Sequence, residues 1–274
     1  LAVIFIRWQD QPAGDFPGGS RADNEAYVAY MKNFHAISSN GQIDLQPDVY
    51  GWYTVPKDIG NNCDDMTTLD LQFQDFINAS TADIDFTQYN LVHFIVNCDR
   101  AFGFATVPPD GRNINDSTGS RFLTYGVDSS TNGKFCTPGS GCVNGNYGEY
   151  GITHEIGHQI GADHSNDWDC GSAIYSDTGC TTHEYYDAYS LMAYRTWDTD
   201  ANHKDTYGWL NSTNLQTLTG SGSFHLCPFE TAGCINVLRE PKQKDASNNI
   251  LSWYYVEWRQ ALGLDGNIPA AAQN

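Results

Sequence analysis

Gly151–His164 has the sequence GITHEIGHQIGADH, which is the most informative segment of this chain. On a helix, His154 and His158 are one turn apart, so both imidazoles leave the same face at a separation that suits a single zinc ion. Glu155 is rotated by about 100° from His154 at 3.6 residues per turn. Glu155 is therefore not expected to be a ligand, but it can reach a water molecule held by the metal.

A third ligand is expected from the residues that follow the helix. Gly161 can adopt a positive φ, end the helix and turn the chain back, which brings His164 towards the same metal. Three neutral imidazoles leave the fourth tetrahedral position open for water, which is typical of a catalytic zinc site. The neighbouring Asp163 is the alternative third ligand.

This arrangement predicts hydrolysis. Zinc lowers the pKa of its bound water towards about 7, and a nearby carboxylate can take the proton of that water during attack on a carbonyl carbon. Glu155 is the candidate for that carboxylate, so it is the predicted catalytic residue.

The full H-E-x-x-H-x-x-G-x-x-H pattern is far more restrictive than H-E-x-x-H alone. On His154, Glu155, His158, Gly161 and His164, the chain resembles the metzincin clan of zinc endopeptidases. The resemblance implies a zincin fold, a Zn²⁺ cofactor held by the three histidines, and a protein or peptide substrate.

Metzincins also carry a methionine turn beneath the metal, and Met192 in the sequence SLMAY (Ser190–Tyr194) is the candidate for it. Astacins and serralysins share the Ser-x-Met-x-Tyr pattern. By that resemblance, Tyr194 is expected to ligate the resting zinc or to donate to the oxyanion. The alternative for Tyr194 is a buried tyrosine with a satisfied hydroxyl.

Two later segments resemble gametolysin-like and immune inhibitor A-like secreted metallopeptidases. His203–Leu210 (HKDTYGWL) is similar to their Lys-x-x-x-Gly-Trp-Leu segment, and Trp253–Asp265 (WYYVEWRQALGLD) is similar to their C-terminal strand, with Glu-x-Arg-Gln and Gly-x-Asp. The methionine turn of this chain differs from that of those families. They usually have Asp-x-Met-Gly, whereas this chain has Ser-Leu-Met-Ala at Ser190–Ala193.

Hydrophobic periodicity predicts an α+β fold with a mixed twisted sheet. The expected N-terminal elements are strands at Ala2–Trp8, Val49–Val55, Leu91–Val96 and Arg121–Tyr125, and helices at Asn24–Ile37 and Met66–Ile77. After residue 215, the segments Ser223–Cys227, Cys234–Arg239 and Leu251–Trp258 are predicted to be antiparallel strands.

A substrate cleft is expected to divide the catalytic domain. Residues 1–161 would form an N-terminal subdomain that includes the zinc-binding helix, with helices above the cleft. Residues 162–266 would form a C-terminal subdomain with the methionine turn and β-hairpins, and residues 267–274 would be a tail or linker. An extended peptide would lie along a sheet edge and add backbone hydrogen bonds to it.

The composition of the chain argues against several other classes of protein. The chain has 274 residues, a formal net charge of −19 and only 14 Lys and Arg residues, so it is not expected to bind nucleic acid. No apolar run approaches the roughly 20 residues of a membrane helix. The 8 cysteines have no C-x-x-C spacing, which favours disulfides between sequential cysteines and a secreted protein.

Other polar residues have more than one candidate role. The Asp-rich loops Asn61–Asp65 and Asp163–Asp169 are either turns or structural Ca²⁺ sites. Three acidic residues are candidates to orient ligand imidazoles: Glu149, Asp187 and Asp198. His35 and His93 lie in apolar patterns and are expected in the core or at the surface.

The resulting hypothesis is a secreted zinc endopeptidase in which Glu155 deprotonates the zinc-bound water and then protonates the leaving amine. Two alternatives remain open. One is a disulfide-stapled adhesion or carbohydrate-binding module with a vestigial metal site, against which the intact Glu155 argues. The other is a zinc hydrolase of a non-peptide amide. The sequence makes no prediction about the oligomeric state.

Overall fold

The computed structural model of the protein describes residues 1–11, 20–60, 66–98, 103–116, 119–129, 147–173, 178–193, 197–266 and 268. Its largest sheet lies in the N-terminal half and has the strand order β2-β1-β3-β6-β4, with β5 also paired to β6. The strands are β1 (Ala2–Trp8), β2 (Asp48–Val55), β3 (Leu91–Val96), β4 (Gly103–Ala105), β5 (Arg112–Asp116) and β6 (Gly119–Ser129).

This sheet is mixed. The pairs among β2, β1, β3 and β6 are parallel, whereas β4 and β5 both run antiparallel to β6. β1 and β3 are almost entirely buried, which explains why both read as continuous apolar runs in the sequence. The predicted mixed α+β fold is therefore confirmed.

One face of the sheet is covered by α1 (Arg21–Ser38) and α4 (Tyr147–Gln159). The N-cap Ser20 and the side chain of Asp23 form a capping box that starts α1. Val28 of α1 and Ile156 of α4 belong to the same buried cluster as Phe5 of β1. This packing places α4, which carries the two helical histidines, directly against the sheet.

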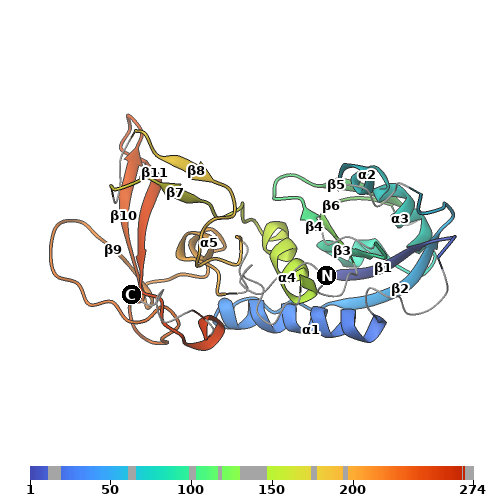
Figure 1. The fold of residues 1–274 in the computed structure, drawn as a ribbon, viewed down its shortest axis with the longest axis horizontal. Coiled ribbons are helices and arrows are strands. Elements are labelled where there is room, and N and C mark those ends of the chain that lie inside the picture. Colours follow the sequence, from blue (N-terminus) through green and yellow to red (C-terminus); the bar gives the residue numbers. More distant parts are fainter. Residues whose placement is uncertain are drawn as a thin grey trace.

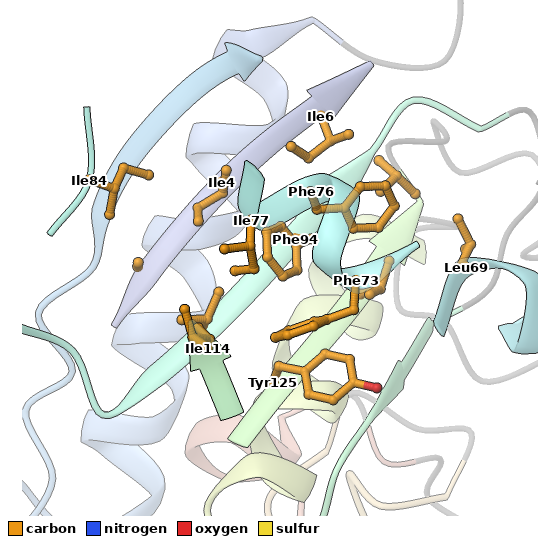
Figure 2. Packing of buried hydrophobic residues seen from close by; sticks show 14 of the residues in the cluster. Ile4, Ile6, Leu69, Phe73, Phe76, Ile77, Ile84, Phe94, Ile114 and Tyr125 are labelled. Carbon is orange, nitrogen blue, oxygen red and sulfur yellow. The ribbon is translucent and has the colours of Figure 1, made fainter. Parts of the chain in front are cut away.

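The other face is covered by α2 (Met66–Leu71) and α3 (Phe73–Ser80). Figure 2 shows the packing there of Phe76 and Ile77 with Ile4 and Phe94. The prediction of one continuous helix over Met66–Ile77 is wrong, because the backbone of Gln72 leaves the helical conformation. Gln72 is buried and accepts a hydrogen bond from the indole nitrogen of Trp8 at 3.0 Å, so this anchor separates the two helices.

The C-terminal part contains a hairpin of β7 (Asp167–Asp169) and β8 (Thr181–His183), the short α5 (Ala201–Thr206), and a sheet of order β11-β10-β9. The strands of that sheet are β9 (Leu215–Thr217), β10 (Val237–Lys244) and β11 (Ile250–Glu257). In Figure 1 these strands and the N-terminal sheet lie at opposite ends of the molecule, with α4 and α5 between them.

One of the predicted C-terminal strands is absent. β10 and β11 form the expected antiparallel pair, but Ser223–Cys227 forms no strand. On the side opposite β11, Val237–Arg239 of β10 pair in parallel with β9, so this part of β10 is not available to Ser223–Cys227. The division of the chain into subdomains at residue 161 stays a prediction.

The C-terminal motif forms a buried ionic cluster. Arg259 is 5% exposed and pairs with Glu257 at 2.8 Å and with Asp265 at 2.8 Å. Asp198 N–H also donates to Asp265 at 3.0 Å. Glu257, Arg259 and Asp265 of the two motifs thus form a cluster that contacts the segment preceding α5.

Two of the expected disulfides are described, Cys170–Cys180 and Cys227–Cys234. Cys98 is also disulfide-bonded, whereas Cys63, Cys136 and Cys142 lie outside the described residues. Among the described helices, none is both long and apolar enough to cross a membrane.

Candidate metal centre

Three imidazoles converge at the end of α4. His154 and His158 lie one turn apart on the helix, and His164 reaches them from the loop that follows. Gly161 has a φ of +123°, which lets the chain reverse direction between the helix and that loop. The candidate ligand atoms of the three histidines all lie within 4.8 Å of one another. These residues can therefore hold a metal ion.

Each of these imidazoles has its Nδ1 next to a hydrogen-bond acceptor. The pairs are His154 Nδ1 with Leu191 O at 2.9 Å, His158 Nδ1 with Ala162 O at 2.6 Å, and His164 Nδ1 with Glu184 Oε1 at 2.7 Å. A neutral imidazole has one N–H, and an Nδ1–H that donates to oxygen leaves Nε2 with a free lone pair. Three Nε2 atoms are thus available for a metal, which is the donor set that zinc accepts.

Burial keeps the imidazoles in the form that binds metal. Desolvation lowers the pKa of His158 to about 4, and it also lowers the pKa of His154 well below its ordinary value. Both side chains are therefore neutral at pH 7. No proton has to be removed before their nitrogens can bind a cation.

The residues that orient the imidazoles differ from those proposed from the sequence. Asp187 accepts a hydrogen bond from Tyr189 N–H, and Asp198 pairs with Lys204. Within the part of the chain that the structure describes, the acceptors at the three Nδ1 atoms are other residues. The side chain of Glu149 lies outside the described residues. Glu184 is the residue that orients the imidazole of His164. It comes directly after β8, in a loop where no local sequence pattern identifies it.

Glu155 lies beside the imidazoles, at the edge of a cavity. The cavity has a volume of about 260 Å³, and its lining includes Glu155, His158, His164, Tyr185 and Gly103. Glu155 is 5% exposed, and burial raises the pKa of its carboxyl group well above the usual range. A carboxyl group in this position is placed for proton transfer to or from a molecule in the cavity.

Sequence reasoning did not identify Tyr185. Its ring lies 3.9 Å from the ring of His164, measured between centroids, and it lines the same cavity. Its φ of 67° is in the left-handed region, which non-glycine residues adopt rarely. Tyr194, which was predicted to act at the metal, lies with residues 195 and 196 outside the described residues.

The side chain of Met192 is completely buried. It packs in one cluster with Tyr150 of α4 and Phe34 of α1. Its backbone N–H donates to Ser190 Oγ at 3.1 Å, and its carbonyl accepts from Ser165 N–H at 2.8 Å. The turn is therefore connected to the residue that directly follows His164.

Substitution of Gly161 tests whether this turn positions His164. Gly161→Ala is expected to cost about 1–3 kcal/mol of stability and to weaken zinc binding, because a side chain strains the backbone at this φ. The matched control is Gly41→Ala, which also has positive φ and open space around it but lies far along the chain from the histidines. Urea unfolding and zinc competition titrations measure the two effects. Unchanged zinc affinity in Gly161→Ala would contradict the proposed role of the turn.

A second group within the described residues satisfies the distance criterion for a metal site, namely His225, Cys227 and Cys234. Its two cysteines form a disulfide and offer no thiolate. Neither group contains a carboxylate, so no cluster of three side-chain ligands in the described ranges supports the predicted Ca²⁺ sites. Asn61–Asp65 lies outside those ranges.

Comparison with known proteins adds one assignment. A family model described as metallo-peptidase family M12 matches residues 21–206, which include all three histidines and Met192. No curated protein matches the chain. A solved structure titled "Structure of a chaperone-substrate complex" is similar with 16% identity and a TM-score of 0.34 over 73% of this chain. This chain spans 28% of the length of that one.

Proposed function

Since the chain belongs to metallo-peptidase family M12, we propose that it is a zinc-dependent endopeptidase with Glu155 as its catalytic residue. One observation carries the proposal. Three histidines place candidate ligand nitrogens within 4.8 Å of one another, and the buried carboxyl group of Glu155, on the helix that carries two of them, lines the adjoining cavity. A structural metal site would not require that carboxyl group.

His154, His158 and His164 would hold the zinc ion. When bound, zinc supplies a Lewis acid that polarises the scissile carbonyl and makes water a better nucleophile at neutral pH. The three acceptors at the Nδ1 atoms fix the imidazole orientations and make the ligands more basic.

Glu155 transfers protons. Its carboxylate accepts a proton from the attacking water and then donates that proton to the nitrogen of the leaving amine. The raised pKa of Glu155 suits both steps, because the carboxyl group must accept and release a proton near the working pH. Its burial also removes competing water molecules from the proton path.

We place the extended peptide substrate along β4. This strand ends the order of the main sheet, so among the described strands one of its edges has no partner. Gly103, Phe104 and Ala105 of β4 also line the cavity that contains Glu155. An extended peptide can pair with this edge, which would place its backbone beside the catalytic carboxyl group.

We assign the chain to the gametolysin-like and immune inhibitor A-like branch of secreted metallopeptidases. The matched family model ends at residue 206, so support comes from the motifs quoted above. In the first motif, Lys204 is 5% exposed and forms an ion pair with Asp198. In the second motif, Arg259 forms an ion pair with Asp265. Residues of both motifs therefore form ion pairs in the fold. The disulfides support secretion.

The experiment presents the zinc-loaded protein with an unfolded protein and, separately, with an N-acylated sugar. We expect fragments of the unfolded protein, no reaction after chelation, and recovery when zinc is restored. Hydrolysis of the sugar amide alone would favour a non-peptide hydrolase. Inactivity towards both, with zinc bound, would favour the binding module.

A further inference from the structure

The β7–β8 hairpin starts and ends at the metal centre. Its first strand begins shortly after His164, and its second strand ends directly before Glu184. Glu184 Oε1 lies 2.7 Å from His164 Nδ1, and the centroid of the Tyr185 ring lies 3.9 Å from that of the His164 ring. The two residues that follow the hairpin thus contact the histidine that precedes it.

Tyr185 also lies where a substrate is proposed to bind. It lines the cavity that contains Glu155, together with all three residues of β4. A peptide paired with β4 would therefore have the Tyr185 ring beside it, and an aromatic ring offers a large apolar contact. The φ of Tyr185 is 67°, and such costly backbone conformations concentrate where ligands bind.

The positions of Glu184 and Tyr185 depend on the hairpin backbone. The side chain of Glu184 is 64% exposed, so the backbone that carries it, rather than burial, sets its position against His164. Tyr185 N–H donates to Asn166 Oδ1 at 3.1 Å. Asn166 directly precedes β7, so this hydrogen bond joins the two ends of the hairpin.

The strand pairing of the hairpin is short. Within the described structure, β7 and β8 form a separate two-stranded sheet in which Asp167–Asp169 pair with Thr181–His183. An isolated two-stranded hairpin is at best marginally stable in water. His183 Nδ1 and Asp167 Oδ1 lie 2.9 Å apart, but both side chains are more than a third exposed, so this pair adds little.

The Cys170–Cys180 disulfide restrains this short ladder. Cys170 directly follows β7 and Cys180 directly precedes β8, so the disulfide closes the ladder at the end away from Glu184. A disulfide restricts the open conformations of the segment that it closes. The hairpin is thus fixed by the disulfide at one end and by the Asn166 hydrogen bond at the other.

We propose that this hairpin is a positioning element of the active site, in which the Cys170–Cys180 disulfide and Asn166 hold Glu184 against His164 and Tyr185 against the bound peptide. This proposal rests on the proposed function, since it takes the three histidines as the zinc site. Glu184 acts through His164, because an acceptor at Nδ1 fixes the ring and leaves Nε2 for the metal. Tyr185 acts on the peptide directly.

The test first separates the two contacts. Glu184→Ala is expected to weaken zinc binding by about 10–100-fold with KM unchanged, because it removes only the outer acceptor. Tyr185→Ala is expected to raise KM for an unfolded protein by about 10-fold with zinc affinity unchanged, because it removes apolar contact area. Tyr185→Phe keeps the ring and should behave as wild type does.

Cys170→Ser combined with Cys180→Ser then tests the hairpin, and it should weaken zinc binding and raise KM together. Serine leaves no thiol that could itself bind zinc. The matched control is Cys227→Ser with Cys234→Ser, which removes a disulfide of similar sequence separation, 7 rather than 10. The control should keep both quantities normal. A Cys170–Cys180 variant in which either quantity stays normal would overturn the proposal.

Two further variants separate positioning from a general loss of stability. Adding Glu184→Ala to the Cys170–Cys180 variant should cause little further loss of zinc affinity, because the contact is already lost. Losses that add in full would overturn the proposal. Asn166→Ala keeps the disulfide but removes the acceptor of Tyr185 N–H, so it should raise KM. It keeps the proposal testable if the disulfide variant does not fold, and a normal KM would overturn it.

Competition with a chromogenic chelator measures zinc affinity independently of cleavage. Zinc affinity that depends on the Cys170–Cys180 disulfide, in a protein that cleaves no substrate, would support the contact with His164 and show that the proposed peptidase function had failed. Absence of zinc binding in the wild type would overturn both proposals.

Discussion

Glu155→Gln is expected to lower kcat on an unfolded protein substrate by about 10²–10⁴-fold, because the amide can neither accept the proton of water nor release one to the amine. Zinc content should stay at the wild-type level, since Glu155 is not among the residues whose ligand atoms converge. Glutamine has nearly the same size, so the cavity lining beside Gly103 is retained.

The measurement is steady-state cleavage, with zinc quantified in the same sample. Thermal unfolding serves as the control for folding. Residual activity above a few per cent of wild type would rule out Glu155 as the general base. Loss of zinc together with activity would instead assign Glu155 to the metal site.

The second large effect is expected from replacement of a candidate metal ligand. His158→Ala is expected to abolish cleavage and to weaken zinc binding by more than about 100-fold, which exceeds the usual effect of losing an outer hydrogen-bond partner. Glu184→Gln tests the outer partner of His164, and it should weaken zinc binding by about 10–100-fold at most.

His225→Ala is the matched control, because its exposed imidazole lies beside a disulfide and away from the three convergent histidines. It should bind zinc and cleave substrate as wild type does. Isothermal titration or competition with a chromogenic chelator measures the affinities. Normal zinc affinity in His158→Ala would show that these imidazoles are not the binding site.

Local patterns in the sequence were sufficient for much of the fold. β1 and β3 have continuous apolar runs because both of their faces are buried, and α1 has apolar residues at helical spacing. The break at Gln72 was not predictable in the same way. It depends on a hydrogen bond to Trp8, which is distant in the sequence.

In the candidate site, too, some features follow from local sequence and others depend on contacts between distant residues. The spacing of His154, His158 and His164 is local, so their convergence could be predicted before the structure. Glu184 and Tyr185 reach His164 through the β7–β8 hairpin, and that approach depends on tertiary packing. The contacts of His93 on β3 with Gln159 on α4 and with Asp128 on β6 likewise require the register of the parallel strands, which composition and periodicity do not specify.

The most direct test of the central claim is a comparison of wild type and Glu155→Gln, each loaded with one equivalent of zinc and mixed with the same unfolded protein. We predict fragments from the wild type alone, with equal zinc in both samples. Equal cleavage by the two proteins would contradict the account, because the zinc site would then act without its proposed base.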